Sequence, residues 1–298
     1  MSGDIGTERA VDRAVLQRVV ARQATAAQAP WLHGEVARRM AERLAVVRRQ
    51  PTLVIDWWSH AGGSHPLLRR AYPQARVLRV EPAGAPAPAA TPWWSPRRWR
   101  DSPGVAASDL PQRQAQLLWA NMMVHSVADP GALFSSWRGA LAVDGFLMFS
   151  TLGPDTLKSL RSIYRDAGWG AAHAPFIDMH DLGDMLVRAG FADPVLDQEL
   201  LRLTWATPAA LRDELRTLGG NAEPTRHGGL RTPRWRARLD AALAERADAD
   251  GRVALEFEIV YGHAFVPPTR VAVAAQTRLS VEQLRDMARA GRRSEPLG

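Results

Sequence analysis

Hydrophobic positions recur at helical spacing near the start of the chain. Over residues 8–49, apolar side chains stand three or four positions apart, for example at Val36 and Met40, which predicts helices with one buried face. Pro30 divides the stretch in two, because proline has no amide hydrogen and ends a preceding helix. We therefore predict an N-terminal helical segment, residues 1–50.

After residue 50, short apolar runs alternate with amphipathic segments. Runs rich in Val, Leu, Ile and Phe predict strands, at 52–55, 76–80, 115–120, 146–150, 194–203 and 252–265. Helical spacing between the runs predicts helices, at 65–72, 131–141, 155–167, 179–189 and 208–218. Asp144-Gly145 predicts a turn, and the glycine- and arginine-rich composition of residues 219–236 predicts a loop. This alternation favours an α/β fold in which a mostly parallel sheet is covered by helices on both faces.

Local composition divides the rest of the chain. We predict one domain over residues 51–268, a helical insertion at 206–250 before its last strand, and a basic tail at 269–298. Residues 83–104 combine prolines with alternating Trp and Arg and predict a loop, since proline inside a helix costs about 3 kcal/mol. Trp and Arg together can stack nucleic-acid bases, but we favour tryptophans that hold the loop on the core.

Composition excludes several kinds of site. The chain has no cysteine, so disulfides, thiolate zinc sites and cysteine nucleophiles are ruled out. Its eight histidines form no His-Glu-x-x-His pattern, so we expect no metal. No apolar run approaches the ~20 residues of a membrane helix, and charges throughout residues 1–20 do not suit a secretory signal. A cytoplasmic protein is expected.

The chain carries a formal net charge of +7, and Lys158 is its single lysine. Two interpretations of this arginine-rich composition stay open. It reflects a GC-rich genome, or it serves an acidic partner such as a carrier protein, phosphate groups or nucleic acid.

Polar residues follow several of the predicted strands. Asp56, Glu81 and Asn121 each come directly after an apolar run, and residues 151–154 form a turn after the next one. Ligands of parallel sheets bind beyond the carboxyl ends of the strands. The sequence therefore predicts one cleft formed by these positions.

Several segments resemble, in order, the class I S-adenosylmethionine-dependent methyltransferases, and among them the biotin-pathway malonyl-acyl-carrier-protein O-methyltransferase group. These segments are residues 117–125, Asp129-Pro130, 145–157, 178–184 and 215–222. The resemblance covers roughly residues 10–265. It implies a Rossmann-like, mostly parallel sheet of seven strands, with N-terminal helices and a helical insertion before the last strand. It also implies methyl transfer from S-adenosylmethionine to the free carboxylate of a malonyl thioester on acyl carrier protein.

The resemblance assigns cofactor-binding roles by position. Asp56 resembles the acid that closes the first strand beside the cofactor loop. Glu81 resembles the acid that takes the ribose hydroxyls, which suits a carboxylate because it accepts two hydrogen bonds. Asp109 and Leu110 resemble the segment that brackets the adenine. Asn121 resembles the residue that ends the fourth strand near the sulfonium.

The glycine loop departs from the family pattern Asp-x-Gly-x-Gly-x-Gly. Trp58 and His60 occupy the first two glycine positions, and Gly62, at the third, is a further cofactor-binding candidate. Gln116 stands where the family has an aspartate before the fourth strand. Glycine allows positive φ and close approach of a ligand. Two hypotheses therefore stay open, an active methyltransferase and a catalytically inactive relative that acts as a binding or assembly factor.

The expected chemistry requires little of the protein. A malonyl carboxylate is ionised near pH 7, since its reference pKa is about 4, so no general base and no catalytic residue are expected. A cation is needed to hold the carboxylate, and the planar guanidinium of arginine grips both oxygens. The candidates are Arg226 and Arg231, with His227 and Tyr261 as neighbours. The expected partner is a malonyl thioester or an acidic acyl carrier protein.

Overall fold

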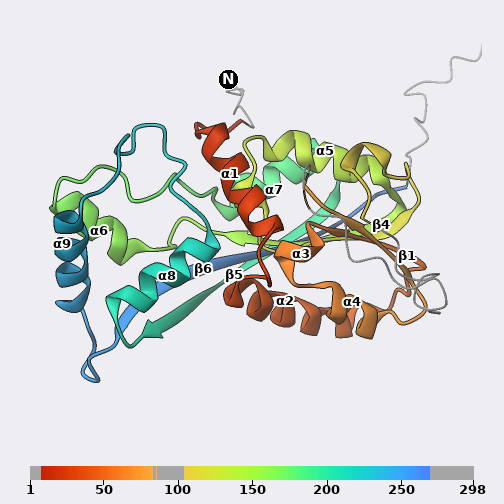
Figure 1. Cartoon of the computed structure of the whole chain (residues 1–298). Coiled ribbons are helices and arrows are strands. Elements are labelled where there is room, and N and C mark those ends of the chain that lie inside the picture. Colours follow the sequence, from red (N-terminus) through yellow and green to blue (C-terminus); the bar gives the residue numbers. More distant parts are fainter. Residues whose placement is uncertain (1–7, 83–84, 86–103, 269–298) are drawn as a thin grey trace, which may run out of the picture. The chain divides into compact units, whose positions relative to one another are not determined.

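The computed structural model describes residues 8–82, 85 and 104–268 (Figure 1). Nearly all of the predicted loop 83–104 and the whole tail 269–298 lie outside the described residues. The described strands form one sheet with the order β2-β1-β3-β4-β6-β5. Their bounds are β1 Leu53–Trp57, β2 Arg76–Val80, β3 Ala115–Ala120, β4 Leu141–Leu152, β5 Ala192–Trp205 and β6 Val253–Phe265.

The sheet is mixed. β1 pairs in parallel with β2 and with β3, and β3 pairs in parallel with β4. β6 runs antiparallel between β4 and β5. The described part of the chain thus has six strands where the resemblance implied seven. At the free edge of β2, Val105 makes a single parallel bridge with Val80, and its amide donates to the carbonyl of Arg79 at 2.9 Å.

The predicted helices are present, with two more that the sequence analysis missed, at 59–62 and 233–244. The described helices are α1 Arg13–Ala24, α2 Trp31–Arg43, α3 Ser59–Gly62, α4 His65–Ala71, α5 Pro130–Ala140, α6 Lys158–Asp166, α7 Met179–Arg188, α8 Pro208–Leu218 and α9 Pro233–Ala244. The prediction of a loop over residues 219–236 was wrong for its last residues, because α9 begins at Pro233 with Thr232 as its N-cap. None of the helices in the described ranges has the length and apolar character needed to cross a membrane.

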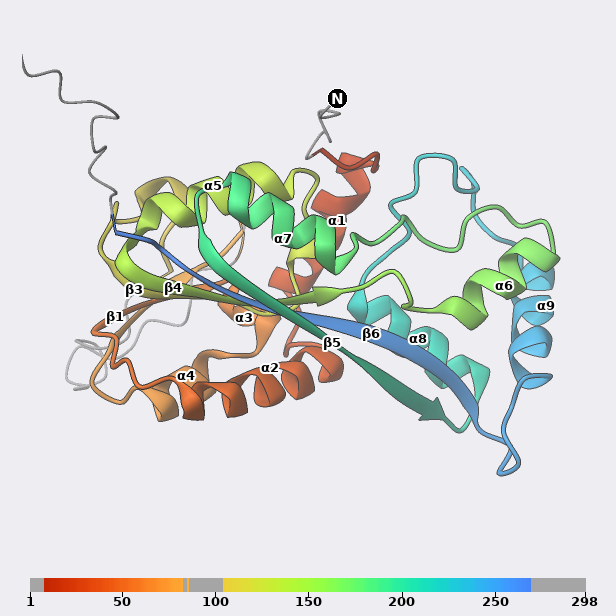
Figure 2. The same cartoon turned by 180° about the vertical axis from the view of Figure 1, so that it is seen from behind.

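Helices cover both faces of the parallel strands. α2 and α4 lie on one face, and α5 and α7 lie on the other (Figures 1 and 2). Side chains of a strand alternate between faces, so Val54 joins the core under α2 while Ile55 joins the core under α5. Both strand faces are therefore apolar, as is typical of a parallel sheet buried on two sides.

The hairpin of β5 and β6 continues beyond the parallel strands, and α6, α8 and α9 gather at its far end (Figure 2). α8 and α9 bury Leu211, Leu218, Leu239 and Leu243 in the same apolar cluster as β6. The insertion between the last two strands is thus packed onto the hairpin that it interrupts. This arrangement forms one wall of the cavity described below.

Candidate functional site

The loop after β1 has a left-handed residue at its first glycine position, although that residue is tryptophan. Trp58 has φ 51° and ψ 51°, in the left-handed region. Its amide donates to the carbonyl of Val80 at 2.6 Å. A non-glycine residue in this conformation costs about 1–2 kcal/mol. The short helix α3 begins directly after it and ends at Gly62; its C-cap Gly63 is also left-handed, with φ 66°.

The two bulky side chains of this loop lie in different surroundings. His60 is exposed, and its Nε2 lies 2.8 Å from the carbonyl oxygen of Ala26, between α1 and α2. Trp58 is half-buried and packs against the apolar cluster on the α5 face, which also contains Leu110. The imidazole is therefore on the surface, whereas the indole is attached to the core.

Two carboxylates lie at neighbouring strand ends. Asp56 is buried, and its Oδ2 accepts a hydrogen bond from Ser59 Oγ at 2.6 Å. Glu81 is half-buried, and its Oε1 accepts from the amide of His60 at 3.0 Å. Burial raises the pKa of Asp56 to about 7 and also raises the pKa of Glu81. Asp56 Oδ1 and Glu81 Oε2 are buried and have no hydrogen-bond partner among the described residues.

Asn121 joins this loop to the rest of the site. Its Nδ2 donates to the carbonyl oxygens of His33, at 2.8 Å, and Gly62, at 2.7 Å, while its Oδ1 accepts from Ser150 Oγ at 2.7 Å. His33 Nδ1 donates to the carbonyl of Ala61 at 2.8 Å. Burial lowers the pKa of His33 to about 4, so its imidazole is neutral near pH 7. These bonds hold α2 and α3 against the end of β3.

Asp109 and Leu110, the predicted adenine neighbours, lie after the bridge of Val105. Asp109 ends the short turn Ala107–Asp109, is exposed, and accepts from Ser108 Oγ at 2.9 Å. Leu110 is buried in the cluster against which Trp58 packs. The predicted cofactor residues thus lie around three adjacent strands, β2, β1 and β3. Asp56, Glu81 and Asn121 lie at or just after the strand ends, Gly62 lies in the loop after β1, and Asp109 and Leu110 lie in the segment before β3.

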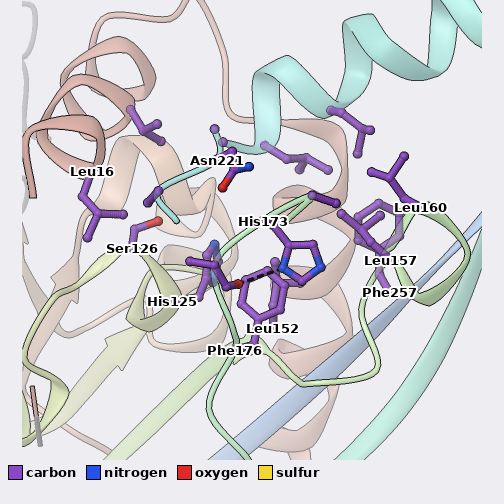
Figure 3. A pocket seen from close by; sticks show the side chains of 18 of the residues that line it. Leu16, His125, Ser126, Leu152, Leu157, Leu160, His173, Phe176, Asn221 and Phe257 are labelled. Carbon is purple, nitrogen blue, oxygen red and sulfur yellow. Dashed lines mark hydrogen bonds between the residues drawn. The ribbon is translucent and has the colours of Figure 1, made fainter. Parts of the chain in front are cut away.

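A cavity of about 290 Å³ lies beside the end of β4 (Figure 3). It is bounded by α1, by the turn Val124–Ser126, by residues 172–176 and by the segment after α8. Its wall is mainly apolar, and Figure 3 labels Leu16, Leu152, Leu157, Leu160, Phe176 and Phe257 there. Its labelled polar side chains are His125, Ser126, His173 and Asn221.

Both histidines of the cavity are neutral. His173 Nδ1 donates to the carbonyl of Ala174 at 2.7 Å, and its ring stacks on Phe176 with centroids 4.8 Å apart. Its Nε2 is buried and has no hydrogen-bond partner in the described part of the chain. Burial lowers the pKa of His173 and the pKa of His125. Neither imidazole therefore brings a positive charge to this cavity near pH 7.

None of the four predicted substrate residues lines this cavity. Arg226 forms an ion pair with Asp12 at 2.8 Å, which neutralises its charge. Arg231 donates to the carbonyl of Trp169 at 2.8 Å. His227 is exposed.

Tyr261 lies apart from the other three. Its side chain is buried on the α2 face of the sheet, where its hydroxyl donates to Glu199 and the Arg43 guanidinium lies 3.8 Å from its ring centroid. The structure therefore does not bring these four residues together around one carboxylate.

The sequence analysis did not single out several residues of the cavity. His125 and Asn221 lie inside segments that carried the resemblance, and that position was the available signal. Arg9 and His173 also line the cavity, but no pattern marked them. Among the described residues, no cluster of His, Asp and Glu suits a metal ion.

Comparison with known proteins identifies the family. No family model matches the sequence. The chain is 37% identical to the malonyl-acyl-carrier-protein O-methyltransferase of Laribacter hongkongensis, over 89% of this chain and 91% of that protein. It is 34% identical to the protein of the same name from Gallionella capsiferriformans, over 89% and 94%. The chain belongs to the malonyl-acyl-carrier-protein O-methyltransferase family.

Solved structures agree on the fold of this family member. The 4+2 cyclase SpnF superposes with a TM-score of 0.50 at 14% identity, over 87% of this chain and 97% of that one. At such low identity, the likeness concerns the fold alone. The α/β fold with a mostly parallel sheet is thereby confirmed, with six described strands.

Proposed function

We propose that this protein is an S-adenosylmethionine-dependent O-methyltransferase of the biotin-pathway type, which methylates the free carboxylate of a malonyl thioester on acyl carrier protein. The observation that carries the proposal is 37% identity over 91% of a relative of that name. The placement of Asp56, Glu81 and Asn121 at or just after the ends of three adjacent strands supports it. This agreement favours the enzyme over a cofactor-free binding or assembly factor.

The strand ends fit a nucleoside-containing methyl donor. Glu81 Oε2 is buried without a hydrogen-bond partner, and such an atom is costly unless a donor reaches it. A ribose hydroxyl is such a donor, so Glu81 would hold the ribose. Leu110 and Asp109 would flank the adenine, while Asp56 and Gly62 would support the loop. Bound S-adenosylmethionine supplies an electrophilic methyl group on its sulfonium.

The chain's own contribution to the reaction is positioning. The substrate carboxylate is already ionised near pH 7, given a reference pKa of about 4, so the neutral His125 and His173 have no proton to remove. The apolar wall of the cavity limits the water around the acceptor, which strengthens electrostatic interactions there. Alignment of acceptor and methyl group within about 3–3.5 Å is the main requirement.

The acceptor is carried by a protein, and α9 offers a surface for it. Arg234, Arg236 and Arg238 are exposed on this helix, and none forms an ion pair among the described residues. Trp235, between them, contacts Tyr164, with ring centroids 6.1 Å apart, and Tyr164 lines the cavity. A basic surface beside the cavity suits an acidic carrier protein. Arg234 and Arg238, four positions apart, share a face of the helix, whereas Arg236 lies on another. These three exposed arginines, the α9 arginines, are our proposed docking surface.

Two measurements test the proposal. Calorimetric titration with S-adenosylhomocysteine should give a saturable heat. Incubation with malonyl-acyl carrier protein and S-adenosylmethionine should give a methyl ester, detected by mass spectrometry of the carrier. Absence of heat at millimolar ligand together with absence of the ester would overturn the enzyme and leave the binding factor.

A further inference from the structure

Arg9 brings a guanidinium to the cavity without any carboxylate partner in the described part of the chain. Its Nη1 donates to the carbonyl oxygens of His125, at 2.6 Å, and Val127, at 3.2 Å. Its Nη2 donates to the carbonyl of Pro175 at 2.7 Å. Arg9 itself lines the cavity. The side chain is thus fixed by three neutral groups at the cavity wall.

The remaining donors of Arg9 suit a carboxylate. A guanidinium has five N–H donors, and the hydrogen bonds of Arg9 to the three backbone carbonyls use three of them. The Nε donor and one Nη2 donor remain. In Arg212 of the same chain, Nε and Nη2 grip the two carboxylate oxygens of Asp240 at 2.7 and 3.1 Å. The nitrogens left available on Arg9 are therefore the pair that forms a bidentate ion pair elsewhere in this protein.

The charge of Arg9 is uncompensated. Burial lowers the pKa of Arg9, because a half-buried cation with only neutral partners loses hydration. The other arginine that lines the cavity, Arg216, pairs with Asp213 at 2.9 Å on the surface. With His125 and His173 neutral, Arg9 is the unpaired positive charge among the described residues of the cavity wall.

We propose that Arg9 holds the free carboxylate of the malonyl thioester in this cavity. The inference rests on the proposed function and replaces Arg226 and Arg231 as the cation at the substrate. An anion paired with Arg9 compensates its charge, while Leu157 and Phe257 face the uncharged remainder of the acyl group. The segment before α1 then distinguishes a malonyl group from an acetyl group, which has no second carboxylate.

Binding of two small thioesters tests this role without the methyl donor. Malonyl-pantetheine and acetyl-pantetheine are titrated calorimetrically into the full chain. The wild type should prefer the malonyl compound by about tenfold or more, as expected for charge-assisted hydrogen bonds. Arg9→Gln should abolish the preference, and Arg9→Lys should keep part of it. Arg13→Gln, which alters an exposed arginine paired with Glu8, is the matched control and should bind like the wild type.

The outcomes separate the two proposals. An Arg9→Gln protein that still prefers malonyl-pantetheine overturns the role of Arg9, even if the wild type methylates the carrier. Equal loss of both thioesters also overturns it, because it shows that Arg9 only holds its loops in place; thermal unfolding of Arg9→Gln and Arg9→Lys measures that effect. A wild type that makes no methyl ester and binds no S-adenosylhomocysteine overturns the proposed function instead.

Discussion

Asn121 Nδ2 donates a hydrogen bond to the carbonyl oxygen of Gly62 at 2.7 Å, so the end of β3 is bonded directly to the loop after β1. The approach is close: a Cβ placed on Gly62 would lie 3.4 Å from the carbonyl oxygen of Asn121. The same amide also reaches the carbonyl of His33 in α2. One side chain thereby fixes the loop, the strand end and a helix from the N-terminal segment.

Replacing Asn121 with Ala should destabilise the fold by about 2–4 kcal/mol, because three hydrogen bonds are lost and their buried partners stay unsatisfied. Urea denaturation measures the change. In a double-mutant cycle, the losses of unfolding free energy caused by Asn121→Ala and by Ser150→Ala alone should add up to more than the loss in the double variant. The reason is that the two side chains are hydrogen-bonded to each other. Ser135→Ala, an exposed hydroxyl on α5, is the control; a comparable loss there would contradict a specific role of the network.

Replacing Glu81 with Gln should weaken binding of S-adenosylhomocysteine by about tenfold or more, because hydrogen bonds to a charged group are worth roughly 1.5–3 kcal/mol. The side chain at this position in Glu81→Gln would have one acceptor oxygen and no charge. The backbone N–H of His60, which now donates to Glu81 Oε1, would then compete with the ribose for that single oxygen. Calorimetry measures the dissociation constant. Glu42→Gln alters an exposed carboxylate of α2 and should leave affinity unchanged. Equal affinity in wild type and Glu81→Gln would exclude Glu81 from the ribose site.

The positions of Asp56, Glu81 and Asn121 were predictable because parallel strands place their carboxyl ends at one edge of the sheet. Their partners were not. His33 reaches Ala61 only because α2 docks onto α3, and no local pattern encodes the docking of two helices. Arg226 illustrates the same limit, since its charge is neutralised by Asp12, which lies 214 positions away in the sequence.

Two predictions failed for local reasons. The glycine- and arginine-rich composition of residues 219–236 indicated a loop, yet Thr232-Pro233 is a helix start signal, an N-cap followed by proline at the first helical position. The turn expected at Asp144-Gly145 is instead part of β4, where the pairing with β3 shifts register and Asp144 has φ 61°. A β-bulge and a turn have similar residue preferences, so the sequence did not distinguish them.

Trp58→Gly should increase the affinity for S-adenosylhomocysteine, whereas His60→Gly should leave it unchanged. The indole packs against the cluster that contains Leu110, the expected adenine neighbour, but the imidazole is exposed and held by Ala26. Trp58→Gly also relieves about 1–2 kcal/mol of left-handed strain while removing buried contacts. Calorimetry on both variants measures the affinity for S-adenosylhomocysteine. If the affinity rises only in His60→Gly, the imidazole, rather than the indole, limits the space for the cofactor.

Stability should depend on pH through two groups that act in opposite directions. Burial raises the pKa of Asp56 from its ordinary value of 3.8 to about 7 in the folded protein, so the folded state keeps a proton that the unfolded chain releases. Its contribution is present below about pH 4 and is lost as pH rises toward 7. His33 has a pKa of about 4, against 6.5. Its neutral form is favoured in the folded state, so its contribution grows as pH rises from about 4 to 6.5.

Single substitutions separate these opposing contributions. Relative to the wild type, Asp56→Asn should become more stable as pH rises from about 4.5 to 6.5, by up to about 1.4 kcal/mol per pH unit. His33→Gln should become less stable relative to the wild type over the same range, by a similar slope. Urea denaturation at several pH values measures both differences. Parallel curves for wild type and Asp56→Asn would show that Asp56 is ionised in the folded protein.

Replacing the α9 arginines together with Gln should weaken the use of malonyl-acyl carrier protein but not of malonyl-pantetheine. The exposed guanidiniums of Arg234, Arg236 and Arg238 attract an acidic carrier, whereas the small thioester needs only the cavity. The apparent KM for the carrier should rise about tenfold at low salt, and the difference should shrink as salt screens the charges. Replacing Arg38, Arg70 and Arg188, which are exposed on α2, α4 and α7, together with Gln is the control for the loss of three charges. An equal loss with both substrates would place the α9 arginines in the folding of the cavity instead of in carrier docking.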